Sequence, residues 1–177
     1  ILSFEPLFAF GSNAASGHHW PDDTRLKPGD CILVDIGCTW EGYCSDMTRT
    51  FFYKNVTQHQ QEVYHTVLKA NEEAEKAVNP GIPLSSLDQI ARGIITDKGY
   101  GSAFTHRLGH FIGLEDHEFG DVSSASADRA VPGNIFSIEP GVYLENDMGV
   151  RVEDLVLVTD HGHEILNHFS KELTVID

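Results

Sequence analysis

Residues 32–51 read Ile-Leu-Val-Asp-Ile-Gly-Cys-Thr-Trp-Glu-Gly-Tyr-Cys-Ser-Asp-Met-Thr-Arg-Thr-Phe, and the rest of the chain is organised around them. Two apolar, β-branched runs flank a polar Glu-Gly interruption, which predicts an antiparallel hairpin. With the turn centred between Trp40 and Glu41, Asp35 and Asp46 lie directly opposite each other. Like charges in that position repel, so the pair needs a proton or a cation between them, and a metal ion is the simpler explanation. The alternative is that Asp35 ends a strand and Asp46 is solvated, although aspartate is depleted in strand interiors.

Composition limits the partners and the setting of the chain. The 177 residues carry a formal net charge of −15 at pH 7. This excess of acids argues against nucleic acid or an anionic membrane as a partner, and bound cations are expected to neutralise part of it. No apolar run reaches the length of a membrane span, and the N-terminal residues do not have the pattern of a signal peptide. The odd number of cysteines, three, predicts a reduced, cytoplasmic protein.

Two helices are expected after the hairpin, over residues 57–78 and 84–99. The first opens with a Thr-x-x-Gln capping box at Thr57. Its apolar residues repeat at helical spacing and are predicted to be core; they are Val63, Val67, Ala70, Ala74 and Val78. Ser85 or Ser86 is expected to cap the second helix, which ends at Gly99. We expect both helices to be packing elements without a chemical role.

Residues 105–118 concentrate potential metal ligands, with three histidines and three acids in fourteen residues. His106 and His110 are four residues apart, but Gly109 and Gly113 argue against a zinc-binding helix of the His-Glu-x-x-His type. An ordinary histidine-rich loop is the alternative.

A second hairpin is predicted from residues 134–144 and 149–159, with its turn around Asn146. Glu139 and Glu153 interrupt its apolar runs and are equidistant from Asn146, so they also face each other across the strands. Two hairpins that each carry a facing pair of acids are difficult to explain as solvated surface.

These segments together offer four carboxylates and one imidazole as candidate metal ligands, on Asp35, Asp46, His110, Glu139 and Glu153. Four ionised carboxylates carry a charge of about −4, which two divalent cations would neutralise, and buried carboxylates at this density cannot all stay ionised without metal. A set rich in oxygen, with one nitrogen and no thiolate, favours Mn²⁺ or Co²⁺, permits Zn²⁺ or Fe²⁺, and disfavours a structural zinc site.

Five pieces of the chain match one family, in the family's order: Val34-Asp-Ile-Gly, Gly42-Tyr-Cys-Ser-Asp-Met-Thr-Arg-Thr-Phe, His106-Arg-Leu-Gly-His-Phe-Ile-Gly-Leu-Glu-Asp-His-Glu, Ser137-Ile-Glu-Pro-Gly and Arg151-Val-Glu-Asp. They resemble the catalytic domain of the pita-bread metallopeptidases, family M24, which includes methionine aminopeptidase, aminopeptidase P and Xaa-Pro dipeptidase (prolidase). The second and last pieces, and the C-terminal segment from Glu164, are most similar to prolidase and aminopeptidase P.

The resemblance implies an α+β, pita-bread fold, an antiparallel sheet with flanking helices. That fold has two similar halves, but nothing equivalent to the helices over 57–78 and 84–99 precedes Ile1. Ile1 itself falls within a strand predicted over residues 1–10. We therefore expect residues 1–177 to be a catalytic-domain fragment that lacks the first-half helices and an N-terminal domain. The resemblance also implies a homodimer in the full-length protein.

The same resemblance assigns the metal ligands. Asp35 would chelate one ion, His110 and Glu139 would bind the other, and Asp46 and Glu153 would bridge both.

Five further positions match family residues around the substrate. His18 matches the loop histidine, and His106 and His117 match two histidines that line the site and steady the tetrahedral intermediate. Arg151 matches an arginine that holds a bridging carboxylate. Tyr143 matches a tyrosine near the site in the proline-specific members.

The reaction implied is hydrolysis of the Xaa–Pro bond in a dipeptide or short peptide with proline in second position. Glu139 would move the proton to the proline nitrogen, His117 would polarise the carbonyl, and His18 and His106 would position the substrate. Two alternatives are aminopeptidase P, which acts on longer Xaa-Pro peptides, and a non-catalytic binding module of the same fold. Such modules lose metal ligands, whereas all five are present here.

Overall fold

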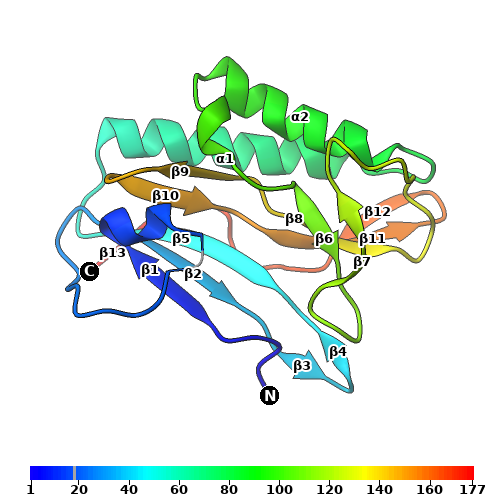
Figure 1. Ribbon diagram of the computed structural model, residues 1–177, viewed down its shortest axis with the longest axis horizontal. Coiled ribbons are helices and arrows are strands. Elements are labelled where there is room, and N and C mark those ends of the chain that lie inside the picture. Colours follow the sequence, from blue (N-terminus) through cyan, green and yellow to red (C-terminus); the bar gives the residue numbers. More distant parts are fainter. Residues whose placement is uncertain (18) are drawn as a thin grey trace.

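A computed structural model describes residues 1–17 and 19–177. The strands form two main sheets, and the two α-helices lie together on one side of them (Figure 1). Helix α1 spans Gln58–Ala77 and α2 spans Leu84–Asp97, with short 3-10 turns η1 at Gly11–Ala15 and η2 at Gly101–Ala103. Neither described α-helix has the combination of length and apolar character that crossing a membrane requires.

The first sheet has the strand order β1-β2-β5-β13. Its strands are β1 (Leu7–Phe10), β2 (Cys31–Ile36), β5 (Met47–Tyr53) and β13 (Thr174–Ile176). All pairs are antiparallel except that of β13 with β5. The strand expected over residues 1–10 is shorter than predicted, since it starts after Pro6, which has no N–H to donate to a ladder.

The second sheet has the order β12-β11-β8-β6-β7 and is antiparallel throughout. Its strands are β12 (Gly162–Ile165), β11 (Asp154–Thr159), β8 (Ile135–Ile138), β6 (Gly109–Phe111) and β7 (Glu118–Val122). Two separate ribbons complete the architecture, β9 (Gly141–Leu144) with β10 (Met148–Arg151), and β3 (Thr39–Trp40) with β4 (Tyr43–Cys44). The predicted α+β arrangement of antiparallel sheet and flanking helices is confirmed.

Both helices form largely as the sequence predicts. Thr57 caps α1 with both halves of the capping box, and all five predicted core residues of this helix are buried. Gly99 follows the last residues of α2 with φ +86°, as expected for a helix-ending glycine. The predicted caps Ser85 and Ser86 are wrong, because the helix begins at Leu84 and both serines lie inside its first turn.

The first hairpin is centred one position later than predicted. Asp35 pairs with Thr48, and β3 pairs with β4 in the same register, so the turn lies between Glu41 and Gly42. Both turn residues have positive φ, 50° and 91°, as a two-residue type I′ turn requires, and glycine is favoured at its second position. Asp46 is therefore the diagonal rather than the direct neighbour of Asp35. Because the shift is two residues, the two carboxylates stay on the same face.

The second hairpin has the predicted centre. Leu144 pairs with Met148 around Asn146, and Ile138 pairs with Asp154 in the same register. The two ladders are therefore parts of one long hairpin, which is interrupted where Glu139 and Glu153 face each other.

Candidate metal centre

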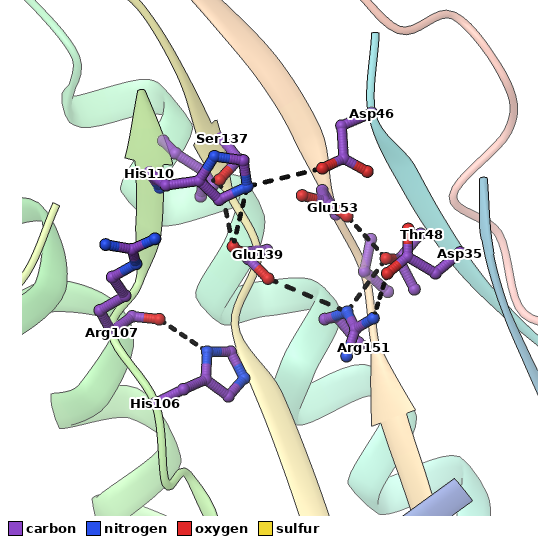
Figure 2. A network of polar contacts seen from close by, with 12 residues as sticks. Asp35, Asp46, Thr48, His106, Arg107, His110, Ser137, Glu139, Arg151 and Glu153 are labelled. Carbon is purple, nitrogen blue, oxygen red and sulfur yellow. Dashed lines mark hydrogen bonds and ion pairs between the residues drawn. The ribbon is translucent and has the colours of Figure 1, made fainter. Parts of the chain in front are cut away.

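All five predicted ligands converge between the two sheets, and we call this group the acidic centre (Figure 2). Its members are Asp35 on β2, Asp46 just before β5, His110 on β6, Glu139 between β8 and β9, and Glu153 between β10 and β11. Three of these five residues, Asp46, Glu139 and Glu153, lie outside regular strands. The breaks in strand pairing within the two hairpins thus allow these carboxylates to reach the space between the sheets.

His110 lies close to the carboxylates on both sides of it. Its Nε2 is 3.5 Å from Asp46 Oδ2 and 3.6 Å from Glu139 Oε1. One potential ligand atom from each of Asp46, His110 and Glu153 lies within 4.8 Å of the other two, and all three residues are buried. This spacing is compatible with a shared cation, with Glu139 bordering the group.

Backbone hydrogen bonds at the hairpin break tie the ligand segments together. The amide of Glu139 donates to Leu108 O (2.8 Å), two residues before His110, and the amide of Glu153 donates to Thr48 O (3.1 Å), two residues after Asp46. Since the two glutamates bond outward rather than to each other, each one is fixed to the segment that carries another ligand.

Arg151 contacts two carboxylates of the acidic centre directly, namely Asp35 and, with its Nε 3.9 Å from Oε2, Glu139. Its Nη2 donates to Asp35 Oδ2, whereas the resemblance implied that it holds a bridging carboxylate. It reaches Glu153 only through Thr48, whose hydroxyl accepts from Arg151 Nε (3.0 Å) and donates to Glu153 Oε2 (2.6 Å). The reason is the corrected register of the first hairpin, which puts Thr48 opposite Asp35.

Hydrogen bonds to His110 fix the tautomer that a metal ligand needs. Its Nδ1 lies 3.1 Å from the carbonyl oxygen of Phe111. A carbonyl only accepts, so Nδ1 carries the proton and the lone pair of Nε2 points toward Asp46 and Glu139. The hydroxyl of Ser137 accepts from the His110 amide (3.0 Å) and donates to Glu139 Oε1 (3.2 Å), which links the two proposed ligands of one ion.

The predicted substrate-site residues lie beside the acidic centre. Arg151 Nη1 donates to Tyr143 Oη (2.8 Å), Tyr143 Oη lies 3.0 Å from His106 Nε2, and His106 Nδ1 donates to Arg107 O (2.7 Å). The ring of His117 is 3.9 Å from that of His110 between centroids, and its side chain is 60% exposed. His18 lies outside the described residues.

Burial and mutual repulsion raise the pKa values of the clustered carboxyls. Burial, followed by the charges of Asp35 and Glu139, raises the pKa of Asp46 to about 7. Burial also raises the pKa of Glu139, and it raises that of Glu153 well above the usual range. Burial lowers the pKa of His110, but the hydrogen bond to Asp46 and the charge of Glu139 more than offset this effect.

Unpaired oxygens show that the donor set fits cations. Asp35 Oδ1, Asp46 Oδ1 and Glu153 Oε1 are buried without a hydrogen-bond partner. Unpaired buried oxygens on three neighbouring carboxylates are costly unless something positive binds them. Oxygen donors with one imidazole nitrogen are the ligands of hard or intermediate divalent cations.

Helix α2 contributes to the site, contrary to the expectation that it only packs. Asp88 is fully buried and binds Arg92 through two hydrogen bonds of 2.9 Å. Arg92 donates to the carbonyl oxygens of Phe104 (2.9 Å) and His106 (2.8 Å), while Asp88 accepts from the amide of Leu108 (3.2 Å). The pair therefore holds the loop that leads to His106 and His110.

Four supporting residues were missed by sequence reasoning, namely Thr48, Ser137, Asp88 and Arg92. Thr48 had a usable signal, because it lies two residues after Asp46 on the same face of the strand. The i, i+4 spacing of Asp88 and Arg92 predicts their ion pair, but nothing local indicates the loop that it holds.

Comparison with known proteins agrees with this geometry. The sequence model of metallopeptidase family M24 matches residues 1–160. The chain belongs to this family. An uncharacterized peptidase of Staphylococcus aureus is 48% identical over 170 residues, which are 96% of this chain and 48% of that protein. The chain thus spans about half the length of the curated relatives it matches, and it has the sequence of a peptidase.

Solved structures of family members superpose closely. A prolidase from Thermococcus sibiricus is 39% identical with a TM-score of 0.97, over 99% of this chain and 48% of that one. An Xaa-Pro dipeptidase from Bacillus anthracis is 35% identical with a TM-score of 0.96, over 99% and 49% of the two chains. An X-Pro aminopeptidase from Thermotoga maritima is 36% identical with a TM-score of 0.95, over 99% and 50%. The fold is therefore the pita-bread fold of these enzymes.

Proposed function

We propose that this chain forms the catalytic site of a dinuclear-metal hydrolase that cleaves Xaa-Pro dipeptides. The observation that carries the proposal is the clustering of Asp46, Glu139 and Glu153 around His110 with Asp35 beside them, and the unpaired buried oxygens on three of these four carboxylates. A chain that needed these acids only for packing would not leave those oxygens without partners.

The acidic centre would hold two divalent cations, most simply Mn²⁺ or Co²⁺, with Zn²⁺ or Fe²⁺ as alternatives. Asp35 would bind one ion, His110 and Glu139 the other, and Asp46 and Glu153 both. When bound, such a pair lowers the pKa of a water molecule and polarises the scissile carbonyl.

The remaining steps belong to side chains. Glu139 would carry the proton to the proline nitrogen. Arg151 restrains Asp35 and, through Tyr143, the ring of His106. His117, exposed beside His110, would donate to the carbonyl oxygen, and His18 and His106 would position the substrate. Residues 1–177 would constitute a fragment of the catalytic domain, and the full-length protein would be a homodimer.

The direct test is hydrolysis of Xaa-Pro dipeptides by the Mn²⁺- or Co²⁺-loaded protein, with Glu153→Gln as the matched variant. Gln has nearly the same shape but is a neutral ligand, so turnover should fall at least about 1,000-fold if Glu153 binds both ions. Near-normal turnover by this variant would refute the assignment.

Aminopeptidase P is a second candidate because the neighbours with TM-scores of 0.95 and above include both an X-Pro aminopeptidase and prolidases. Rates on Xaa-Pro and Xaa-Pro-Xaa substrates separate the two. Preference for the dipeptide supports the prolidase assignment, and preference for the longer peptide replaces it.

A further inference from the structure

Asn71 on α1 bonds to both chain segments that carry Glu139 and Glu153. Its side chain is completely buried. The amide Nδ2 lies 2.9 Å from the carbonyl oxygen of Ile138 and 3.4 Å from that of Val152, the residues directly before the two glutamates. One NH₂ group has two hydrogens, so it bonds both strands at once.

The contact falls at the interruption of the second hairpin. There the amides of Glu139 and Glu153 donate to Leu108 and Thr48 rather than across the hairpin. The two strands are thus pulled outward by their neighbours, and Asn71 supplies a donor group that holds them together on the helix side.

Lys171 fixes the orientation of Asn71. Its Nζ lies 2.9 Å from Asn71 Oδ1. An ammonium group only donates and a carbonyl only accepts. The amide therefore has a single orientation that satisfies all its partners, with Oδ1 on Lys171 and Nδ2 on the two strands.

Lys171 is itself held in a group of charges that we call the rear cluster, consisting of the buried Arg49, Glu75 and Asp154 and the half-buried Lys171. Its Nζ lies 2.7 Å from Glu75 Oε2 and 2.8 Å from Asp154 Oδ2. Arg49 Nη2 lies 2.6 Å from Asp154 Oδ1. The Oδ1 atom of Asn71 is therefore anchored by a set of ion pairs. Its Nδ2 atom bonds the segments that carry two residues of the acidic centre.

We propose that Asn71 is a positioning residue that sets the separation of Glu139 and Glu153, and with it the spacing of the two cations. The inference rests on the proposed dinuclear function, because it assigns the two glutamates to different positions of one paired site. Paired ions in such sites lie close together. A small displacement of one carboxylate should therefore weaken binding of the second ion more than binding of the first.

The experiment compares Asn71→Ser and Asn71→Asp with Val67→Ala in the full chain. The serine is too short to reach either carbonyl, and the aspartate keeps the shape and a bond to Lys171 but cannot donate. Val67 is equally buried on α1, so its truncation controls for a general loss of helix packing.

Two readouts are used, and neither is activity. In the metal-free chain, we expect hydrogen exchange at the amides of Glu139 and Glu153 to accelerate at least 10-fold in both Asn71 variants, beyond any change at other core amides. In Mn²⁺ titrations followed by paramagnetic resonance, we expect the second ion to bind at least 10-fold more weakly and the signal of spin-coupled pairs to disappear. Binding of the first ion should change less than 3-fold, and Val67→Ala should bind both ions normally.

The possible outcomes separate this inference from the proposed function. Wild-type exchange at both amides together with normal paired binding in Asn71→Ser would overturn the role of Asn71. A wild-type chain that binds fewer than two ions would refute the dinuclear function, while exchange at the two amides would still decide whether Asn71 positions the strands. Should Asn71→Asp not fold, Asn71→Ser alone decides.

Discussion

The acidic centre and the rear cluster are built from consecutive residues of the same segments, yet their charges balance differently. Thr48 and Glu153 serve the acidic centre, while their chain neighbours Arg49 and Asp154 serve the rear cluster. Successive residues of an extended segment point to opposite sides. One sequence step therefore separates a candidate metal centre from a structural ion-pair network.

The rear cluster is complete within the chain. Its two carboxylates face two cations, and each carboxylate oxygen lies within 3 Å of Arg49 or Lys171, although Asp154 Oδ2 meets Lys171 as an ion pair without hydrogen-bond geometry. The acidic centre instead has four carboxylates and one histidine, with Arg151 beside it, and three of its oxygens have neither a hydrogen bond nor an ion pair among the described residues. Buried acids alone therefore do not mark a metal site. What marks one is the lack of enough protein cations to pair them.

The largest expected effect is on the rear cluster. Arg49→Met removes a buried guanidinium and leaves Asp154 with one cation, so the free energy of unfolding should fall by about 3–5 kcal/mol. Urea denaturation measures it. Since no ligand atom is removed, saturating Mn²⁺ should not restore the loss. A loss below about 1 kcal/mol would contradict the structural role of this cluster.

The next largest effect is the gain in stability of the acidic centre when cations are added. Mn²⁺ at 100 times its dissociation constant should stabilise the wild-type chain by about 2.7 kcal/mol for each site occupied. Glu153→Gln removes one charged ligand and should lose most of this gain while remaining folded in chelator. Equal stabilisation of both proteins in thermal denaturation would show that Mn²⁺ binds elsewhere.

The stability of the metal-free chain should depend on pH in the opposite sense to most proteins. Burial raises the pKa of Asp46 from 3.8 to about 7, so the folded chain keeps a proton that the unfolded chain releases. The stability that this proton contributes is therefore fully present below pH 4 and is lost as pH rises through about 7, a loss of about 4 kcal/mol.

Mn²⁺ should reverse this trend, because metals bind the deprotonated ligands. Asp46→Asn is the matched variant and should show a shallower loss between pH 5 and 8 in chelator. Glu75 of the rear cluster also has a pKa raised to about 7, chiefly by burial, and the part of the slope that Mn²⁺ does not remove should come from it. Unfolding curves that become more stable from pH 5 to 8 in chelator would contradict the assignment.

The smallest effect distinguishes two threonines of β5. Thr48→Val loses the hydroxyl that connects Arg151 with Glu153, whereas Thr50→Val loses one that bonds only the backbone of Arg151. Each should cost about 1 kcal/mol of stability. Only Thr48→Val should also weaken Mn²⁺ binding, by several-fold in calorimetry. Equal Mn²⁺ affinities would place Thr48 outside the site.

Much of the fold could be predicted because local patterns encode it. The capping box at Thr57 and the apolar repeat define α1, and the symmetry of Glu139 and Glu153 about Asn146 gives the register of the second hairpin. The first hairpin was misplaced by one residue because the position of Gly42 in the turn outweighs the apolar pattern. The five ligand positions converge as predicted, although their roles remain predictions.

The supporting residues could not be predicted, since their partners are remote in the sequence. Asn71 bonds residues 67 and 81 positions away, and a buried Asn among apolar helix positions looks like an irregularity of the core. The hydrogen bond of Arg151 with Asp35 could not be predicted, because it depends on the register of a hairpin more than a hundred residues earlier. Periodicity describes one element at a time and does not identify such contacts.

The segment around Asn167 also dictates when the acidic centre can be assembled during synthesis. Asn167 donates to the backbone carbonyl of Asp46 (3.0 Å) across 121 residues, and Arg49 donates to the carbonyl oxygens of Phe169 and Ser170. A nascent chain that has emerged only through Glu153 has all five ligands but lacks these ties. Contacts of such long sequence separation form slowly in folding, so the proposed metal site would be held in place only after the chain beyond Lys171 has left the ribosome.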